Sequence, residues 1–125
     1  MLKKGEEMEK TVSIDGKEIK LLSSGVTPII YKNAFGRDYF ADVGTMIEAV
    51  SGTGKSKSDQ QMVISLMKSG ALTNIVNFLW AYAKNADGTI PKFEDWLRKF
   101  QNFAVLDFAE DVLDLIMSSL KTSKK

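Results

Sequence analysis

The spacing of apolar residues changes near position 22, and this change divides the chain into a short β segment and a long helical segment. Between residues 10 and 22, apolar side chains occupy alternate positions on both sides of Asp15-Gly16. Alternation with a period of two is typical of strands that bury one face, and Asp-Gly between two such runs indicates a two-residue turn. The pattern predicts an N-terminal β-hairpin whose buried face contains Val12, Ile14, Ile19 and Leu21.

Beyond the hairpin, apolar residues recur at helical spacing, and neighbouring residues predict where the first two helices begin and end. Thr27-Pro28 predicts a cap followed by proline in the first turn, and Gly36 can end this helix of residues 29–35 in the left-handed conformation. Asp38 can cap the second helix. The apolar face of the second helix is expected to contain Phe40, Val43, Ile47 and Val50.

The most apolar segment is the helix expected at residues 72–86. At 100° per residue its apolar side chains cover an arc of roughly 200°, about twice the width typical of a surface helix. We therefore expect this helix to lie at the centre of the molecule. Its apolar residues are Leu72, Ile75, Val76, Phe78, Leu79, Trp80, Tyr82 and Ala83.

Two amphipathic helices are expected after the central one. Ile90-Pro91 precedes a short helix, and the last helix is expected at residues 105–120. The apolar stripe of the short helix contains Phe93, Trp96, Leu97 and Phe100. The polar side of the last helix has an acidic ridge of Asp107, Glu110, Asp111 and Asp114. The predicted fold is α+β, mainly α, with the N-terminal β-hairpin packed on a bundle of five to six short helices.

The chain length fits one domain, because roughly two thirds of the unfolded surface can be buried at this size. We place the domain at residues 11–120, after a flexible N-terminal segment (1–10) and before a flexible basic tail (121–125). Residues 51–58 contain Ser-Gly-Thr-Gly-Lys-Ser and are expected to form a flexible loop. Ser58 and Gln61 then form a capping-box pattern before a helix of residues 62–68.

Composition narrows the chemistry that this chain can perform. It contains no cysteine and no histidine, which excludes disulfides, thiolate metal sites and the usual general base. The formal net charge is +1, too balanced to predict nucleic-acid or membrane binding by electrostatics. No apolar run reaches the ~20 residues needed to span a bilayer. From the charge balance and the lack of such a run, we expect neither a nucleic acid nor a membrane as a partner. We also predict no catalytic residues, no cofactor and no bound metal.

A nucleotide-binding motif is the main competing interpretation of residues 49–56. Ala-Val-Ser-Gly-Thr-Gly-Lys-Ser fits the phosphate-loop pattern if its first glycine is replaced by alanine, with Lys55 and Ser56 as phosphate and magnesium ligands. Such a loop must follow a buried strand and lead directly into a helix. The preceding residues have helical spacing instead, so the sequence favours a plain loop.

Two groups of residues are candidates for binding a partner protein. The acidic ridge is typical of a solvated helix face, and docking of a basic partner is the alternative. The aromatic residues are mainly core candidates, but so much apolar helix surface can leave a patch exposed. Trp80 and Tyr82 are then the candidates, because amphipathic aromatics are enriched in binding hot spots.

Several segments of the chain, in their order and spacing, are similar to those of a known protein family. They are residues 13–19 of the hairpin, Tyr-Lys-x-x-Phe-Gly-Arg-Asp at 31–38, residues 77–87 with Trp-Ala-Tyr-Ala-Lys, Ile90-Pro91 before Glu-Asp-Trp-Leu, and the C-terminal amphipathic helix. Together they resemble the tail assembly chaperones of long-tailed phages and prophages of Gram-positive bacteria. The resemblance covers residues 11–115.

The resemblance implies a non-enzymatic protein made in the host bacterial cytoplasm and absent from the finished virion. Members of this family bind the tape measure protein, keep it soluble and help the tail tube protein to polymerise around it. A second copy of the chain is a further candidate partner. The resemblance also implies a longer form made by frameshifting, and Ser123-Lys124-Lys125 is compatible with an adenine-rich slippery codon run. The alternatives are a tail tube or completion protein retained in the virion, or a small nucleotide-binding protein.

Overall fold

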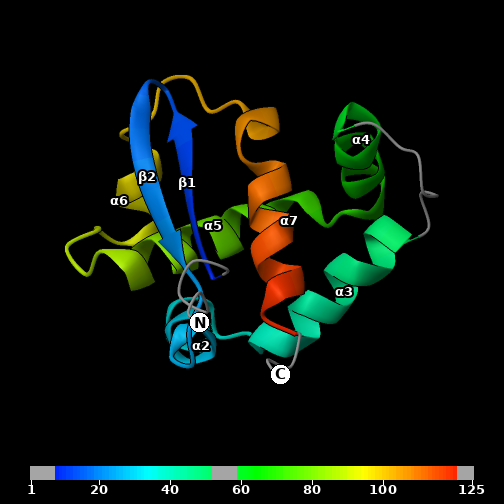
Figure 1. Cartoon of the computed structure of the whole chain (residues 1–125), viewed down its shortest axis with the longest axis horizontal. Helices are drawn as coiled ribbons and strands as arrows, with labels where there is room; N and C mark the ends of the chain where they lie inside the picture. Colours follow the sequence, from blue (N-terminus) through cyan, green and yellow to red (C-terminus); the bar gives the residue numbers. More distant parts are fainter. Residues whose placement is uncertain (1–7, 52–58, 121–125) are drawn as a thin grey trace, which may run out of the picture.

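A computed structural model describes residues 8–51 and 59–120 of this chain. The described part is mainly helical, at 60%, and contains a two-stranded antiparallel hairpin and six helices, which confirms the predicted α+β, mainly α fold (Figure 1). The elements are β1 (Glu9–Ile14), β2 (Lys17–Leu22), α2 (Thr27–Phe35), α3 (Tyr39–Ser51), α4 (Asp59–Ser69), α5 (Leu72–Ala86), α6 (Phe93–Leu97), the 3₁₀ turn η1 (Val105–Asp107) and α7 (Ala109–Ser118).

The hairpin closes at the predicted turn. Asp15 and Gly16 have φ angles of 56° and 75°, and left-handed conformations at both central residues define the turn that matches strand twist. Val12, Ile14 and Leu21 are buried, and Ile19 packs against the core. The strand β2 lies across α5, while β1 lies beside α7 (Figure 1). The hairpin thus finds the packing partner that it needs for stability.

Helix α2 ends and helix α3 begins close to the predicted residues, but the predicted cap at the start of α2 is wrong. Gly36 ends α2 at a φ of 69°, and the Asp38 carboxylate accepts a hydrogen bond from the Ala41 N–H at 2.8 Å, as predicted. Thr27 is not the cap, because it lies within α2 and is buried. Its hydroxyl accepts a hydrogen bond from the Ser24 N–H at 2.9 Å, so it stabilises the turn before the helix.

The buried face of α3 matches the predicted one in part. Val43 is buried and Ile47 packs against the core, as predicted, whereas Phe40 is 54% exposed and Tyr39 and Met46 are buried instead. This rotation of α3 brings the Tyr39 hydroxyl to 2.8 Å from that of Tyr82 on α5, and hydrogen-bonded hydroxyls can be buried at little cost. The predicted face followed apolarity alone and therefore missed the polar contact that orients the helix.

The central helix forms as predicted. Helix α5 spans Leu72–Ala86, and its residues from Asn77 to Ala83 are all buried. It contacts β2, α2, α3, α4 and α7. The wide apolar arc of this helix is covered from several directions at once, which is why it can be central in so small a protein.

The last predicted helix is interrupted. Residues 105–107 form η1, and α7 begins only at Ala109, because Phe108 between them has a φ of −131°. The Phe108 ring is fully buried and lies 5.0 Å from the Phe103 ring. Helical periodicity could not anticipate this break, since it results from packing one aromatic side chain against the preceding loop.

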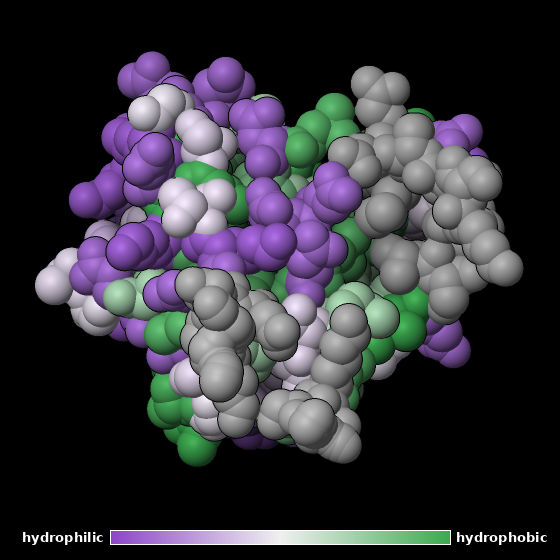
Figure 2. All heavy atoms as spheres, viewed as in Figure 1, coloured by the Kyte–Doolittle hydropathy of each residue, from purple (hydrophilic) through white to green (hydrophobic). Residues whose placement is uncertain are grey.

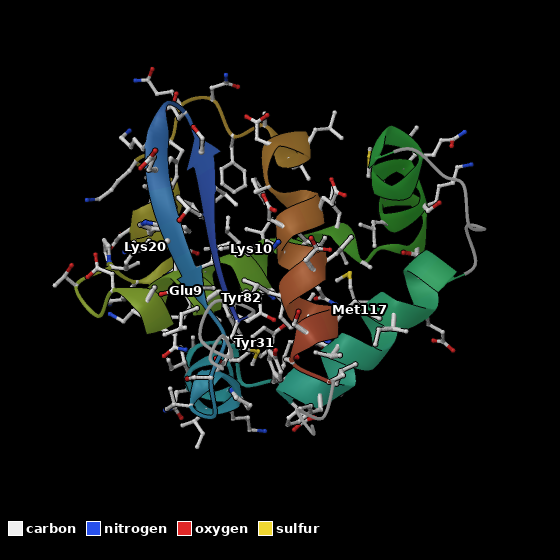
Figure 3. All side chains as sticks on the ribbon, viewed as in Figure 1. Glu9, Lys10, Lys20, Tyr31, Tyr82 and Met117 are labelled. Carbon is white, nitrogen blue, oxygen red and sulfur yellow. The ribbon has the colours of Figure 1, made fainter. Side chains whose placement is uncertain are left out.

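Charged residues connect the hairpin to α7. The Lys10 ammonium lies 3.4 Å from the Asp114 carboxylate and 4.0 Å from that of Asp111. Figure 3 shows Lys10 extending from β1 toward α7. Because all three side chains are at least a third exposed, these ion pairs contribute little to stability, about 0–1 kcal/mol in total.

Several large apolar side chains remain at the surface of the described residues. Figure 2 shows hydrophobic side chains gathered at the lower left, where Figure 1 places α2. Exposed fractions range from 45% to 58% for Val26, Ile29, Phe40, Ile64, Met67, Leu106, Met117 and Leu120. These exposed side chains lie on or next to several separate elements, namely α2, α3, α4, η1 and α7.

Some predicted features fall partly or wholly outside the described residues. These are most of the flexible segments 1–10 and 121–125, most of the loop 51–58, and the capping residue Ser58. Strand β1 begins at Glu9, two residues before the predicted domain start, and α4 begins at Asp59 rather than at residue 62. In the parts of the chain that are described, no helix has the length and apolarity required to cross a membrane.

Candidate functional site

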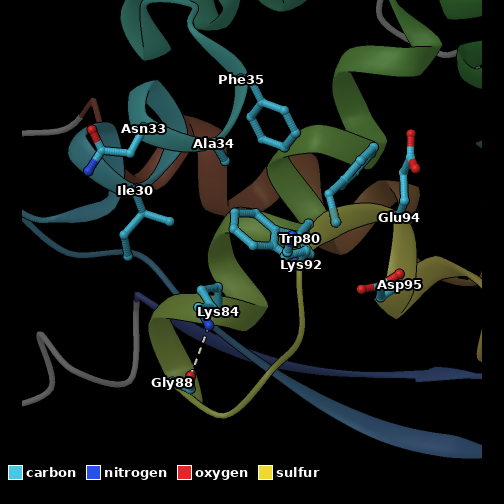
Figure 4. A pocket seen from close by; sticks show the side chains of 11 residues that line it. Ile30, Asn33, Ala34, Phe35, Trp80, Lys84, Gly88, Lys92, Glu94 and Asp95 are labelled. Carbon is cyan, nitrogen blue, oxygen red and sulfur yellow. Dashed lines mark hydrogen bonds between the residues drawn. The ribbon is translucent and has the colours of Figure 1, made fainter.

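An open groove of about 880 Å³ lies between α2, the C-terminal half of α5 and α6 (Figure 4). Its walls come from two regions that are distant in sequence, namely α2 and the consecutive elements α5 and α6. Its lining residues are Ile30, Asn33, Ala34, Phe35, Trp80, Lys84, Gly88, Lys92, Phe93, Glu94 and Asp95. The volume falls in the range of sites that bind small molecules or anchoring side chains of a partner.

The floor of the groove is aromatic. The Phe35 ring centroid lies 5.6 Å from that of Trp80 and 5.0 Å from that of Phe93, with edge-to-face geometry in both pairs. The Trp80 indole N–H donates a hydrogen bond to the Pro91 carbonyl at 2.9 Å. Edge-to-face packing and this hydrogen bond hold the three rings in place, so the floor is preorganised.

The α2 wall of the groove is apolar and continues onto the outer surface. Ile30 and Ala34 line the groove. Val26 lies just before α2, four residues before Ile30, and Ile29 lies three residues after Val26 and about 100° round the helix from Ile30. Val26 is 45% exposed and Ile29 is 58% exposed. We call Val26, Ile29, Ile30 and Ala34 the α2 stripe. It adds exposed apolar surface of α2 to the apolar wall of the groove.

The charges at the groove are of two kinds. The Lys84 ammonium donates hydrogen bonds to the carbonyls of Gly88 and Ile90 at 2.9 and 2.6 Å, so it holds the loop between α5 and α6. Glu94 and Asp95 at the start of α6 point toward solvent, with side chains 80% and 58% exposed. Both lie within 4 Å of Arg98, an exposed pairing that water screens strongly. The α6 rim therefore presents accessible carboxylates.

The two aromatic candidates for partner binding lie in or next to the core, the position expected for most of the aromatic residues. Tyr82 is fully buried and is therefore not exposed to a partner. Burial raises the pKa of its hydroxyl, which shares a hydrogen bond with Tyr39. Trp80 is only 5% exposed, yet one edge of it forms part of the groove floor. Neither side chain protrudes, because the other elements cover α5 on nearly every side.

The residues of the acidic ridge are divided between two elements, and a lysine of the hairpin contacts two of them. Asp107 lies in η1, while Glu110, Asp111 and Asp114 lie in α7. The hairpin supplies Lys10 to two of these carboxylates, and burial raises the pKa of Asp111. Among the described residues, no three acidic side chains converge as metal ligands do. The basic group that the ridge meets in this structure belongs to the same chain.

A buried polar cluster was not anticipated from the sequence. The Asp42 carboxylate is 2% exposed and accepts two hydrogen bonds from the Arg37 guanidinium, at 2.6 and 2.7 Å, and one from the Tyr31 hydroxyl. The Arg37 hydrogen bonds hold the pKa of Asp42 below its ordinary value, and burial raises that of Tyr31. This cluster fixes α2 against α3 and thereby positions the α2 wall. The signal in the sequence is an aspartate inside an apolar helix, four residues after its cap.

The phosphate-loop interpretation lacks the strand that it requires. The residues before the motif belong to α3, which continues to Ser51, so no buried strand leads into it. Lys55 and Ser56 themselves lie outside the described residues. A phosphate-binding loop also needs an aspartate at the end of a second strand to bind magnesium, and Asp107, which follows the apolar run 103–106, lies exposed in a 3₁₀ turn instead.

The groove combines a fixed aromatic floor, an apolar wall and a carboxylate rim. The sequence indicated Trp80 as a binding candidate. It did not indicate that Ile30, Phe35, Phe93 and Glu94 line the same groove, because the groove depends on how three separate helices meet. Its composition suits an amphipathic helix, which inserts apolar side chains and places basic ones at the rim. No protein-family model, curated protein or solved structure matches this chain.

Proposed function

We propose that this protein is a non-enzymatic tail assembly chaperone of a long-tailed phage or prophage. It binds the tape measure protein in the host cytoplasm, keeps it soluble, helps the tail tube protein to polymerise, and is left out of the finished virion. The order and spacing of the hairpin, the 31–38 segment and the 77–87 segment support the family. The groove between α2, α5 and α6 is the observation that carries the binding activity.

The groove supports this function through its shape and its chemistry. A client kept soluble by a chaperone exposes amphipathic helices, and their apolar side needs a partner surface. The α2 stripe and the aromatic floor supply that surface, and Glu94 and Asp95 favour clients with lysine or arginine beside the apolar side. An open groove binds each client segment weakly, and many copies along a long client raise the overall affinity while still permitting release.

The test is a co-expression experiment with the tape measure protein encoded in the same genome. Wild-type chain is expected to raise the soluble fraction of the client. Ala34→Arg puts a long charged side chain at the groove wall, where Ala34 is exposed, and is expected to reduce this rescue by about tenfold, the effect of losing one anchor site. The matched control Thr45→Arg adds the same side chain on an exposed position of α3 and should rescue normally.

Circular dichroism of both variants separates lost binding from lost folding. Failure of the wild-type chain to solubilise the client contradicts the chaperone function. Rescue that is equally strong in Ala34→Arg contradicts the groove as the site. Proteomics of purified particles separates this function from the structural alternative, because a tail tube or completion protein is present in the virion and a chaperone is absent.

A further inference from the structure

The outer edge of β2 carries backbone groups that point away from the hairpin. In a hairpin with a two-residue turn, the residues flanking the turn form a hydrogen-bonded pair, and such pairs alternate along the strands. Ile14 and Lys17 flank the turn, and the Ser23 N–H donates to the Met8 carbonyl at 2.9 Å, as this alternation requires. The N–H and C=O groups of Glu18, Lys20 and Leu22 therefore face outward.

Within the described part of the chain, the outward backbone groups of Glu18 and Lys20 have no hydrogen-bond partner, whereas Leu22 has one. The Leu22 carbonyl accepts a hydrogen bond from the Asn85 side chain at 3.0 Å, which closes one end of the edge. No backbone hydrogen bond from another described element reaches Glu18 or Lys20. An unpaired strand edge is a template for another strand unless something covers it.

The surroundings leave this edge accessible, unlike the opposite edge of the hairpin. Strand β1 has α7 beside it (Figure 1). Along β2 there is instead a hollow of about 320 Å³, lined by Glu18, Ile19, Lys20, Ala86, Asp87 and Ile90. Figure 3 shows Lys20 on the side of β2 that faces away from β1. The hollow offers room for side chains of an added strand.

We propose that β2 pairs with β2 of a second copy of this chain, which joins the two hairpins into one four-stranded antiparallel sheet. The charges of Glu18 and Lys20 favour a second copy of β2 as the partner strand, and they also favour one alignment of the two strands. With Ile19 opposite Ile19 of the second copy, Glu18 of each chain lies opposite Lys20 of the other. The outward backbone groups of Glu18 and Lys20 then form two hydrogen-bonded pairs, each exchanging two N–H···O bonds.

Neighbouring registers are disfavoured by the same charges. A shift of two residues in one direction places Lys20 opposite Lys20, and a shift in the other direction places Glu18 opposite Glu18. Like charges directly opposite each other destabilise a sheet, whereas opposite charges stabilise it. A one-residue shift would put the inward-facing groups of β2, which already pair with β1, at the interface. Only the Ile19-centred register satisfies both the backbone and the side chains.

The proposed dimer also uses the hollow. Ile19 is partly exposed and packs against the core on the same face as Leu21. At the two-fold axis, the Ile19 side chains of both copies form a close cross-strand pair beside Ile90, so apolar surface is buried under the new strand pair. The two-fold symmetry makes this an isologous contact, which closes at two copies and does not propagate.

Charge variants of the full chain test the pairing. Sedimentation of the wild-type chain is expected to show the mass rising from 13.9 kDa toward twice that value between about 5 µM and about 500 µM. Glu18→Lys alone and Lys20→Glu alone each place like charges opposite one another and should stay monomeric. An equimolar mixture of these two variants restores opposite charges at every pair and should form a heterodimer. Lys68→Glu on α4 is the matched control and should dimerise like the wild type.

Amide hydrogen exchange of the wild-type chain gives a second readout that needs no variant. The amides of Glu18 and Lys20 should become protected as concentration rises, while those of Thr11 and Ser13 on the outer edge of β1 should not. A wild-type chain that stays monomeric at about 500 µM overturns the proposal and leaves the edge to a different protein. A dimer that persists in both variants, or unprotected Glu18 and Lys20 amides in a dimer, places the contact elsewhere and also overturns it.

Discussion

A single buried carboxylate holds the first two helices together. Asp42 is nearly inaccessible, and its oxygens accept hydrogen bonds from the guanidinium of Arg37 and the hydroxyl of Tyr31. Charge-assisted, bidentate contacts of this kind are stronger than neutral hydrogen bonds. Removing Arg37 would leave the buried Asp42 carboxylate with only the Tyr31 hydroxyl as a hydrogen-bond partner, and an incompletely paired buried charge costs more than one hydrogen bond contributes. At the scale of residues, this cluster is therefore a sensitive point outside the apolar core.

Asp42 should make the stability of the protein depend on acid pH. Its pKa is lowered in the folded state, chiefly by hydrogen bonds from Arg37, so its contribution is fully present above the unfolded pKa of about 4 and is lost as pH falls through the folded pKa. Asp87 acts in the same direction, and Asp111, whose pKa is raised by burial, acts in the opposite one. The free energy of unfolding, measured with urea, should therefore fall below about pH 4.

Replacing the carboxylate isolates its part of this pH dependence. Asp42→Asn should lower the free energy of unfolding at pH 7 by about 1–3 kcal/mol and should show a smaller further loss below about pH 4. Asp107→Asn removes an exposed carboxylate and serves as the control, with stability near that of the wild type at pH 7. If Asp42→Asn and the wild type lose stability in parallel at acid pH, another group is responsible.

At the scale of elements, glycine has two opposite roles in the helical part. Gly36 ends α2 with a φ of 69°, a conformation that side chains disfavour. Gly44 lies within α3, and a methyl group there would meet no atom within 4 Å apart from the adjacent backbone of its own helix. The first glycine is required by backbone geometry, while the second makes α3 less stable than alanine would.

A pair of identical substitutions tests this difference. Gly36→Ala should lower the free energy of unfolding by about 1 kcal/mol, because alanine is strained at positive φ. Gly44→Ala should raise it by about 0.5–1 kcal/mol, because glycine in a helix interior costs conformational entropy. Urea denaturation of both variants measures the two effects, and each variant is the control for the other. Equal changes of the same sign would contradict this account of the two sites.

The elements themselves were predicted well, but their boundaries and faces were less so. Local patterns located the hairpin turn, the end of α2 at Gly36 and the whole of α5, since each depends on residues adjacent in sequence. The break at Phe108 and the rotation of α3 were missed. Both result from side chains that pack against other elements, and no local pattern contains that information.

At the scale of the whole molecule, an aromatic network joins the helices. The Phe78 ring on α5 lies 5.1 Å from that of Tyr31 on α2 and 5.4 Å from that of Tyr39 on α3. Tyr82 continues this network and is fully buried. Such pairs add about 0.5–1.5 kcal/mol each beyond the burial of area. Tyr82, one of the two aromatic candidates for partner binding, therefore stabilises the fold instead.

Stability and client binding should separate when core and surface residues are changed. Tyr82→Ala should lower the free energy of unfolding by about 3–5 kcal/mol, because it leaves a large cavity in the core. Ile29→Ala on the α2 stripe should change it by about 0.5 kcal/mol or less, since the side chain is 58% exposed. Ile29→Ala should nevertheless weaken rescue of the client. Denaturation and co-expression measured on the same variants check both expectations, and a large loss of stability in Ile29→Ala would contradict them.

The sequence by itself determined the class of fold and the central place of α5. A period of two around Asp15-Gly16 specifies a hairpin, and an apolar arc of roughly 200° can be buried only at the centre of a helical bundle. These features follow from neighbours within a few residues of one another, and such neighbours are visible in a linear pattern.

Only the tertiary structure decided which surfaces are left for partners. It buried Tyr82, placed Lys10 against Asp114, which is 104 residues away in the sequence, and built the groove from Phe35, Trp80 and Phe93 on three different helices. It also left the edge of β2 open. Contacts between distant segments depend on how whole elements pack, and packing is a property of the assembled molecule rather than of any one stretch of sequence.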